Sequence, residues 1–200
     1  IRNFLNEKKF NVQINISDET ELLLDTGGGV FAATDNFNDN PFRASYVSEK
    51  VKNYGPIDIA IIPFAGHGPY PMFYTNLEGK ALENKASEKK LKYFNEFVEY
   101  INILKPKYTI PSAGGVVCAG RKALRYMYSG IGTKTEAVKF ANENAKIKTN
   151  IILLSSLNSY DFESDKRTGK YFEKNHANSY EYLNKIANKK NKFSSGGRFF

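Results

Sequence analysis

The sequence predicts a layered α/β fold in which the segment after an initial hairpin forms one half of an αββα sandwich. Predicted strands and helices alternate along most of the chain, which is typical of such folds. The first two predicted strands have no helix between them, which argues against a simple doubly wound sheet. An amphipathic helix over residues 87–104 then separates two apolar strands, so these segments can pack as layers.

The composition is that of a globular protein. Of the 200 residues, 41% are hydrophobic and 25% are charged, which is too apolar for a disordered chain. The longest apolar stretch, residues 57–65, is far shorter than a membrane span and contains Asp58, so we expect no contact with a membrane. Cys118 is the single cysteine, which excludes an internal disulfide and favours a reducing, cytoplasmic setting.

Local patterns predict each strand. Residues 12–16 alternate between apolar and polar, and a polar turn separates them from the apolar residues 20–24, which indicates a hairpin. Residues 57–64 are almost continuously apolar, as in a central strand that is covered on both faces. The remaining expected strands are residues 30–33, 108–110 and 151–154.

The helices are predicted from periodicity and capping signals. In residues 87–104 apolar side chains recur every three or four positions, opposite a polar face that includes Lys89. Thr133 and Glu136 have the spacing of a capping box, which predicts a helix that runs to about residue 144. The same spacing at Asn178 and Glu181 precedes a helix expected at residues 182–187. Two further helices are expected at residues 44–53 and 121–128.

Charge is distributed unevenly along the chain. There are 29 basic and 21 acidic residues, a formal net charge of +8, and residues 161–200 hold nine basic against five acidic residues. We expect residues 1–160 to form the α/β domain and residues 161–200 a basic extension with a short helix. The extension can attract nucleic acid or another anion, but its scattered Lys and Tyr residues favour a solvated surface instead.

Three predicted loops follow strands, at residues 27–40, 65–74 and 111–120. If these strands share one sheet and run the same way, their loops lie together at its edge, where open α/β sheets bind ligands. The loops and strand ends supply Asp25, Asp35, Asp39, His67, Tyr70, Ser112, Gly114, Cys118 and Arg121. The sequence therefore predicts a single cleft to which all three loops contribute.

Asp35 and His67 are the main candidates for chemistry. A carboxylate at Asp35 can bind Zn, Mn or Fe, with Asn36 and Asn38 as orienting neighbours. A residue of this kind in a polar loop also forms Asx-turns, so both interpretations stay open. His67 lies between two glycines directly after the central strand, where an imidazole can act as a general base or simply be exposed.

Spacing argues against two familiar kinds of site. The glycine run at residues 27–29 lacks the lysine and the spacing of a nucleotide P-loop, so a sharp bend between strands is the better interpretation. Ser112 has no nucleophile-elbow sequence around it, which argues against a serine-hydrolase triad. Arg121 can bind an anion together with Lys122 and Arg125, or the three residues can lie on the solvent-exposed side of a helix.

The order of these segments resembles the second half of metallo-β-lactamase-fold proteins. The resemblance rests on the strand at residues 58–64, PFAGHGPYPMFY, a KKLKYFNEFVEYINIL helix and LKPKYTIPSAGG, and it covers residues 12–162. Within this fold, the sequence most resembles the branch that contains CMP-N-acetylneuraminate hydroxylase and bacterial metallo-hydrolases. It resembles ascorbate-6-phosphate lactonase more remotely. The resemblance implies an αββα sandwich with a divalent metal at one edge that supports hydrolytic or iron-oxygen chemistry.

The resemblance also suggests roles for single residues. The metal-bridging carboxylate of the family falls on Asp35, with Asp25 as the less favoured alternative. The last metal histidine of the family falls on Ala113, although the K-P-K sequence and the proline before it match. The H-x-H-x-D-H signature of the first half is absent from a chain that contains two histidines and begins at Ile1 without a methionine. We therefore expect the upstream half of the fold on a longer polypeptide or on another chain.

Two functions follow as hypotheses. The first is a metal-dependent, hydrolase-like enzyme that acts on a small anionic substrate of the phosphate, lactone or sugar-nucleotide type. In this enzyme Asp35 binds the metal and His67 is catalytic, and the substrate contacts are Tyr70, Ser112, Gly114 and Arg121. The alternative is a binding module of the same fold that has lost catalysis and recruits an anionic partner through its basic tail.

Overall fold

The computed structural model describes residues 11–16, 20–25, 29–33, 49, 56–66, 68–114, 120–173 and 176–188. For the strands up to residue 33, and for residues 120–122 and 176–179, it describes the backbone alone. Two compact units are present. The first comprises residues 1–66, 90–114 and 132–173, and the second comprises residues 67–89, 115–131 and 174–200.

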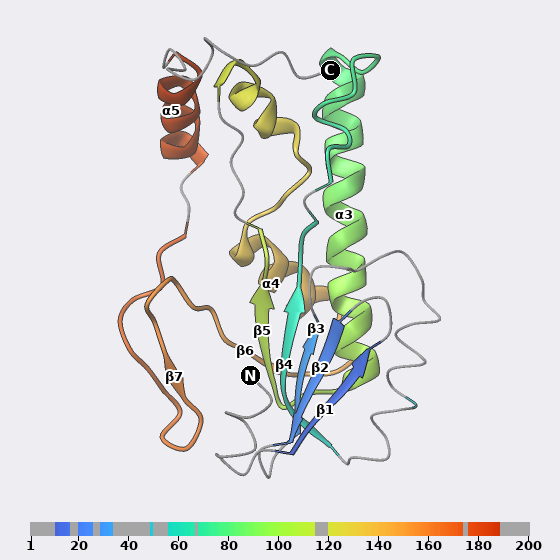
Figure 1. The fold of residues 1–200 in the computed structure, drawn as a ribbon, viewed down its shortest axis with the longest axis vertical. Coiled ribbons are helices and arrows are strands. Elements are labelled where there is room, and N and C mark those ends of the chain that lie inside the picture. The colour runs from blue at the N-terminus through green and yellow to red at the C-terminus, as the bar shows by residue number, and fades with distance from the viewer. Residues whose placement is uncertain are drawn as a thin grey trace. The chain divides into compact units, whose positions relative to one another are not determined.

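The first unit is built on a six-stranded sheet in the order β1-β2-β3-β4-β5-β6 (Figure 1). Its strands are β1 (Asn11–Ile16), β2 (Thr20–Asp25), β3 (Gly29–Ala33), β4 (Ile57–Pro63), β5 (Tyr108–Ser112) and β6 (Asn150–Ile151). Strands β1 to β3 pair antiparallel, whereas β3 to β6 pair in parallel. The predicted hairpin is confirmed, and the fold is a mixed α/β fold with a small parallel sheet. The αββα sandwich stays a prediction.

The core of the first unit lies around β4 and β5. Ala60 and Ile62, which share one face of β4, are fully buried, whereas Ile59 and Ile61 on the opposite face are only partly buried, so the cover on both faces that the sequence predicts is incomplete. Helix α3 (Gly79–Leu104) belongs to this unit from Lys90 onward, and there it buries Phe97 and Ile101 completely. Helix α4 (Lys134–Asn144) packs against β5 with its small buried residues Ala137 and Ala141.

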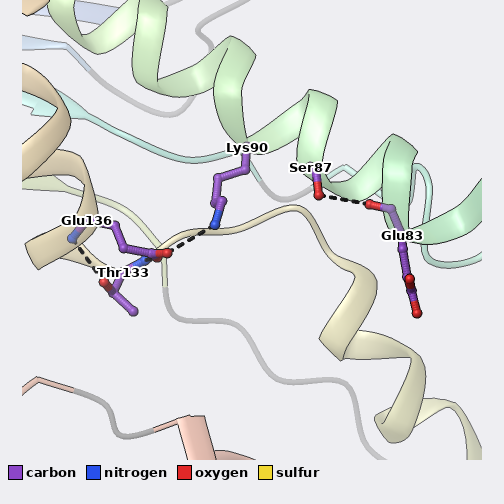
Figure 2. A network of polar contacts seen from close by, with 5 residues as sticks. All are labelled: Glu83, Ser87, Lys90, Thr133 and Glu136. Carbon is purple, nitrogen blue, oxygen red and sulfur yellow. Dashed lines mark hydrogen bonds and ion pairs between the residues drawn. The ribbon is translucent and has the colours of Figure 1, made fainter. Parts of the chain in front are cut away.

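A capping box fixes the start of α4, as the sequence predicts (Figure 2). The Glu136 backbone N–H donates to the Thr133 hydroxyl at 3.1 Å, and the Thr133 backbone N–H donates to the Glu136 carboxylate at 2.7 Å. Lys90 of α3 also donates to this carboxylate, at 3.0 Å. Glu136 therefore joins α4 to α3 as well as completing the capping box of its own helix.

A small hairpin, β7 (Tyr160–Asp161) with β8 (Lys166–Arg167), follows the sheet in sequence. It brings Tyr160 and Phe162 against the ring of Tyr108 on β5, with ring centroids 6.2 and 5.1 Å away. The Asp161 carboxylate accepts hydrogen bonds from the backbone N–H of Glu163 and the hydroxyl of Ser164, which closes the turn. The sequence patterns predict neither strand.

The second unit contains the first part of α3, a 3₁₀ helix η2 (Gly120–Tyr128) and helix α5 (His176–Ala187). Helix α5 packs against η2. Its buried side chains include Met72, Leu82, Ala123 and Leu183, each less than 7% exposed. The predicted helix at residues 121–128 is therefore present, but in the tighter 3₁₀ form.

Four predicted boundaries differ from the structure by two residues or more. Helix α3 begins at Gly79 rather than at residue 87, because buried Leu82 extends its apolar face by a further turn. Strand β6 ends at Ile151 rather than at residue 154, since the carbonyls of Leu153 and Leu154 accept from Arg167 and Lys134 side chains.

The predicted cap at Asn178 is wrong, because α5 already begins at His176. Strand β5 continues through Pro111, where the sequence predicts the start of a loop. The helix expected at residues 44–53 lies outside the described residues, apart from helical Glu49. The boundary expected near residue 160 stays a prediction, as does the cytoplasmic location. None of the helices in the described ranges is both long enough and apolar enough to cross a membrane.

The contacts of Glu136 predict how acid affects stability. Burial raises the pKa of Glu136, but hydrogen bonds from Thr133 and Lys90 outweigh burial and bring the pKa below its ordinary value of 4.5. The folded state thus gains stability from this carboxylate above about pH 4.5 and loses it as the pH falls through the folded-state pKa. We expect Glu136→Gln to lower the free energy of unfolding by less than about 1 kcal/mol at neutral pH, because the side chain is partly exposed.

Urea unfolding of the variant and the parent at neutral and acidic pH measures this effect. The difference between them should shrink in acid. Glu143→Gln on the exposed side of the same helix is the matched control and should change the free energy of unfolding little. A Glu136→Gln effect that stays constant across both pH values would contradict the assignment.

Candidate functional site

The carboxyl ends of β3, β4 and β5 lie at one edge of the sheet. Ala32 pairs with Ile61 and Pro63 pairs with Ser112, so β4 and β5 end level and β3 ends one residue earlier. The three arrows point the same way in Figure 1. The chain segments after these strands therefore leave from the same edge, as the sequence predicts. We call this edge the strand rim.

Phe64 holds the rim together where β4 ends. Its backbone N–H donates to the carbonyl of Ser112 at 3.2 Å, which extends the pairing of β4 and β5 beyond Pro63. The Phe64 side chain is 1% exposed, and its ring lies directly against Gly114. A Cβ atom on Gly114 would come within 2.7 Å of the ring, so a glycine is required for the chain to pass there.

The backbone turns sharply after Ser112. Ala113 has φ of 67° and Gly114 has φ of 81°, both in the left-handed region. This conformation is natural for glycine but costs an alanine roughly 1 kcal/mol, and among other residues Asn, Asp and His adopt it most readily. Strain of this kind concentrates at ligand sites. Ala113 is the position that the family resemblance assigns to a metal histidine.

Glycine is also required at the end of the segment after β4. A Cβ atom on Gly66 would overlap the phenol ring of Tyr93 on α3, so the helix and the rim approach each other closely there. Gly66 is the last residue of this segment that belongs to the first unit. The predicted catalytic residue His67 follows it and lies outside the described residues, as do Asp35, Asp39 and Cys118.

Asp25 lies at the other edge of the sheet. It ends β2 and pairs with Gly29, the first residue of β3, because β2 runs antiparallel to β3. The carboxyl end of β3 is therefore a strand length away. The alternative assignment of the metal carboxylate to Asp25 is wrong for a site on the strand rim.

In the second unit two cations hold a single loop. Lys89 Nζ donates to the carbonyls of Gly68 and Tyr70, at 3.1 and 2.7 Å. Arg125 donates through Nε to the Met72 carbonyl at 2.5 Å, and through its second guanidinium nitrogen to the carbonyls of Tyr74 and Leu77, both at 3.2 Å. Five carbonyls of residues 68–77 thus point at two positive charges. We call this arrangement the carbonyl clamp.

Neither cation of the clamp has the role that its sequence context suggests. The helical pattern puts Lys89 on the solvent-facing side of its helix, but it is 9% exposed, and desolvation lowers the pKa of its ammonium group. By its sequence context, Arg125 is either an anion ligand or a solvent-exposed residue of a helix. In the structure it instead donates hydrogen bonds to backbone carbonyls. The seven-residue spacing from Leu82 to Lys89 places both on one helical face, a signal that emerges once α3 is extended to Gly79.

The remaining predicted contacts are divided between the units. Ser112 and Gly114 lie on the strand rim of the first unit, both half-buried. Tyr70 belongs to the second unit, is 38% exposed and packs edge-on against Tyr74, with ring centroids 5.0 Å apart. Arg121 lies in η2 of the same unit, and its side chain is outside the described part of the structure. The structure thus brings Ser112 and Gly114 together, and their proximity to Tyr70 and Arg121 stays a prediction.

Comparisons with known proteins yield one weak likeness. No family model matches the chain. No curated protein matches its sequence. A solved structure of a mutant CmlA beta-hydroxylase aligns with 72% of this chain and 29% of that chain, at 15% sequence identity and a TM-score of 0.36. A TM-score this low carries no argument about fold or activity, and the chain spans less than a third of that protein.

The described residues do not by themselves hold a metal ion. In the part of the chain that the structure describes, no group of three or more His, Cys, Asp and Glu side chains converges. Any metal centre on the strand rim therefore depends on the segments that follow β3 and β4, where Asp35 and His67 occur in the sequence.

Substitution of Gly114 tests the close approach at the rim. Gly114→Ala should lower the free energy of unfolding by about 2–4 kcal/mol, because the new methyl group meets the Phe64 ring and adopts left-handed backbone. Gly68→Ala is the matched control, since no atom lies within 4 Å of the place that its methyl group would take, and it should cost less than about 1 kcal/mol. Chemical denaturation followed by circular dichroism measures both variants, and equal losses would contradict the packing described.

Substitution of Arg125 tests the carbonyl clamp. Arg125→Lys keeps the charge but cannot reach three carbonyls at once, so we expect a loss of about 1–3 kcal/mol and faster proteolysis within residues 68–77. Arg167→Lys, at an exposed arginine that donates to the carbonyls of Leu153 and Gly169, is the matched control. It should cost less than about 1 kcal/mol. Unchanged proteolysis in Arg125→Lys would show that the clamp does not hold the loop.

Proposed function

We propose that this chain is part of a metal-dependent hydrolase of the metallo-β-lactamase fold whose site lies on the strand rim. Its substrate is a small anion of the phosphate, lactone or sugar-nucleotide type. The observation that carries the proposal is the parallel register of β3, β4 and β5, which directs the three segments that follow them away from a single edge. The support for the family is the motif order in the sequence.

Covalent reach limits where the two key residues can lie. Asp35 is two residues beyond Ala33, the end of β3, which allows at most about 7 Å between their Cα atoms. His67 is bonded directly to Gly66, so its Cα lies about 3.8 Å from that residue. Adjacent strands are about 4.8 Å apart. A carboxylate and an imidazole can therefore both reach the rim, which supports a shared site.

These donors fit a partial metal site. A carboxylate oxygen and an imidazole nitrogen suit Zn, Mn or Fe, but two protein ligands are fewer than such sites use. Ala113 offers no donor where the resemblance expects one. The remaining ligands accordingly come from an upstream half of the fold or from another chain. A bound divalent metal would supply Lewis acidity and would acidify a water molecule.

The proposed tasks of the other residues follow from their chemistry. His67 accepts and returns a proton near neutral pH. The Ser112 hydroxyl can donate a hydrogen bond to a substrate oxygen, and Gly114 lets the backbone come close to the ligand. Tyr70 and Arg121 belong to the second unit, and a phenol and a guanidinium are groups that can bind an anion.

A second function is favoured by Ala113. The absence of a metal donor at this position suits a binding module of the same fold that has no catalytic activity. Metal content separates the two functions, since the module requires none.

The test uses the full chain, alone and with its upstream half where one is encoded. Metal is measured by mass spectrometry after loading with Zn, Mn or Fe(II), and hydrolysis is assayed on an aryl phosphate, a lactone and a nucleotide sugar. Asp35→Asn should abolish metal retention, whereas Asp39→Asn in the same loop should retain it. His67→Gln should lower turnover by about 10²–10⁴ with metal retained. A parent protein that takes up none of these metals would overturn the proposal.

Ala113→His provides a gain-of-function arm. Histidine tolerates the left-handed backbone at this position and would add an imidazole to the strand rim. We expect tighter metal binding in titration calorimetry, and no such gain when Asp35→Asn is also present. Lys166→His, at an exposed position of β8, is the control for an added histidine.

A further inference from the structure

The two faces of the six-stranded sheet are covered unequally. Ala60 of β4 pairs with Thr109 of β5, so the two side chains share one face, and both are fully buried. Ile61 pairs with Ile110 on the opposite face, and both are only partly buried although they lie on central strands. We call the face that carries Ile61 and Ile110 the open face.

Helices α3 and α4 lie together on the buried face. Helix α4 packs against β5, and its Phe140 meets Phe94 of α3 with ring centroids 5.6 Å apart. Strands β3 to β6 follow one another across the sheet in sequence order, and right-handed crossovers between such strands all fall on one side of a sheet. On the open face, the rings of Tyr160 and Phe162 cover Tyr108 at the β5 end. The rest of this face needs cover from another source.

Strand register extends the open face over β1, β2 and β3. Ile59 pairs with Val30, Val30 with Leu24, and Leu24 with Val12, and paired residues lie on the same face of a sheet. The aliphatic residues at open-face positions are Val12, Ile14, Ile16, Leu22, Leu24, Val30, Ala32, Ile59, Ile61 and Ile110. No charged residue occupies an open-face position of β1, β2, β3 or β5, or of β4 from Ile59 onward.

Strand β1 distinguishes the two faces most clearly. Val12, Ile14 and Ile16 hold its open-face positions, and the alternate positions hold Asn, Gln and Asn. In a strand that alternates in this way, the apolar side is the side that packs against other protein. The apolar side of β1 is thus opposite to the side on which the helices lie.

We propose that the open face is the contact surface between two copies of this chain, which pack sheet against sheet about a two-fold axis. A two-fold axis brings the same surface of both copies together, and an aliphatic face without charge is complementary to itself. The same lack of charge offers an acidic or basic partner no ion pair.

Paired sheets lie about 10 Å apart, and the helices of each copy are then on the outside. Two copies together therefore form the layers helix, sheet, sheet and helix, which is the arrangement that the sequence predicts for the fold. The proposal does not depend on a metal or on hydrolysis at the strand rim.

The size of the open face suits such a dimer. Five strands about 4.8 Å apart, each of about five residues, cover roughly 24 by 17 Å, or about 400 Å² in projection. Two copies together bury about twice this area, and more as accessible surface because side chains stand out from the sheet, which approaches the ~1,000 Å² of a specific interface. Apolar patches of this size on soluble proteins are commonly interaction sites.

Neighbouring substitutions in β1 test the proposal. Sedimentation equilibrium of the full chain between about 1 and about 100 µM should show a dimer that dissociates on dilution. Ile14→Lys places a charge on the open face and should weaken association at least about 100-fold, because the ammonium group would be buried without a partner. Gln13→Lys adds the same charge one residue away on the opposite face. It is the matched control and should change the association constant less than about twofold.

A milder variant keeps the test independent of misfolding. Leu22→Thr removes apolar area from the open face but retains a residue that suits strands, so it should weaken association at least about fivefold while the chain stays folded. Circular dichroism checks the fold of each variant. The urea midpoint of the parent should rise with protein concentration, because dissociation is linked to unfolding, and that of Ile14→Lys should not.

Three outcomes would overturn the proposal. One is a full chain that stays monomeric at the highest concentration. Another is a dimer that both open-face variants leave intact, or that Gln13→Lys weakens as much as Ile14→Lys does, since the contact would then lie elsewhere. The third is a series of ever larger species in place of a closed dimer. Metal uptake and hydrolysis are separate measurements, so the failure of either proposal leaves the other standing.

Discussion

Parallel pairing of β4 with a neighbour on each side is the constraint on which the first unit depends. A parallel partner on both edges puts the carboxyl ends of β3, β4 and β5 at the same edge of the sheet, and it requires long connections to bring the chain back to the start of each strand. Helix α3 provides one of these connections, and its Phe97 and Ile101 are buried as a result. The close contacts of Gly66 with Tyr93 and of Gly114 with Phe64 are consequences of that packing. The packing of the core therefore determines the shape of the strand rim.

Local patterns in the sequence were sufficient for elements whose cause is local. The hairpin of β1 and β2 follows from alternating residues around a polar turn, and the start of α4 follows from Thr133 and Glu136. Where long-range contacts determine the position of a side chain or the end of a strand, the local sequence pattern gives the wrong prediction. Lys89 resembles a solvent-facing residue because its acceptors, the carbonyls of Gly68 and Tyr70, lie about twenty positions away. Side-chain donors likewise replace the ladder that would have lengthened β6.

The candidate site shows the same division. That the segments after three strands leave from one edge was predictable, since it requires only that the strands be parallel. Which side chains then meet depends on tertiary folding: Asp25 lies at the wrong edge, Arg125 serves the backbone, and Tyr70 and Arg121 belong to another unit than Ser112.

The attachment of Lys89 to its loop has a consequence for alkaline conditions. An ammonium group has three hydrogens, whereas the neutral amine has two, and Lys89 has two carbonyl acceptors. Since desolvation lowers its pKa, this lysine loses its proton earlier than an exposed one would. Both hydrogen bonds can survive that loss. The hydrogen bonds to Gly68 and Tyr70 thus lose the strength that charge gives them at a lower pH than those of an exposed lysine would, although the amine still has a hydrogen for each carbonyl.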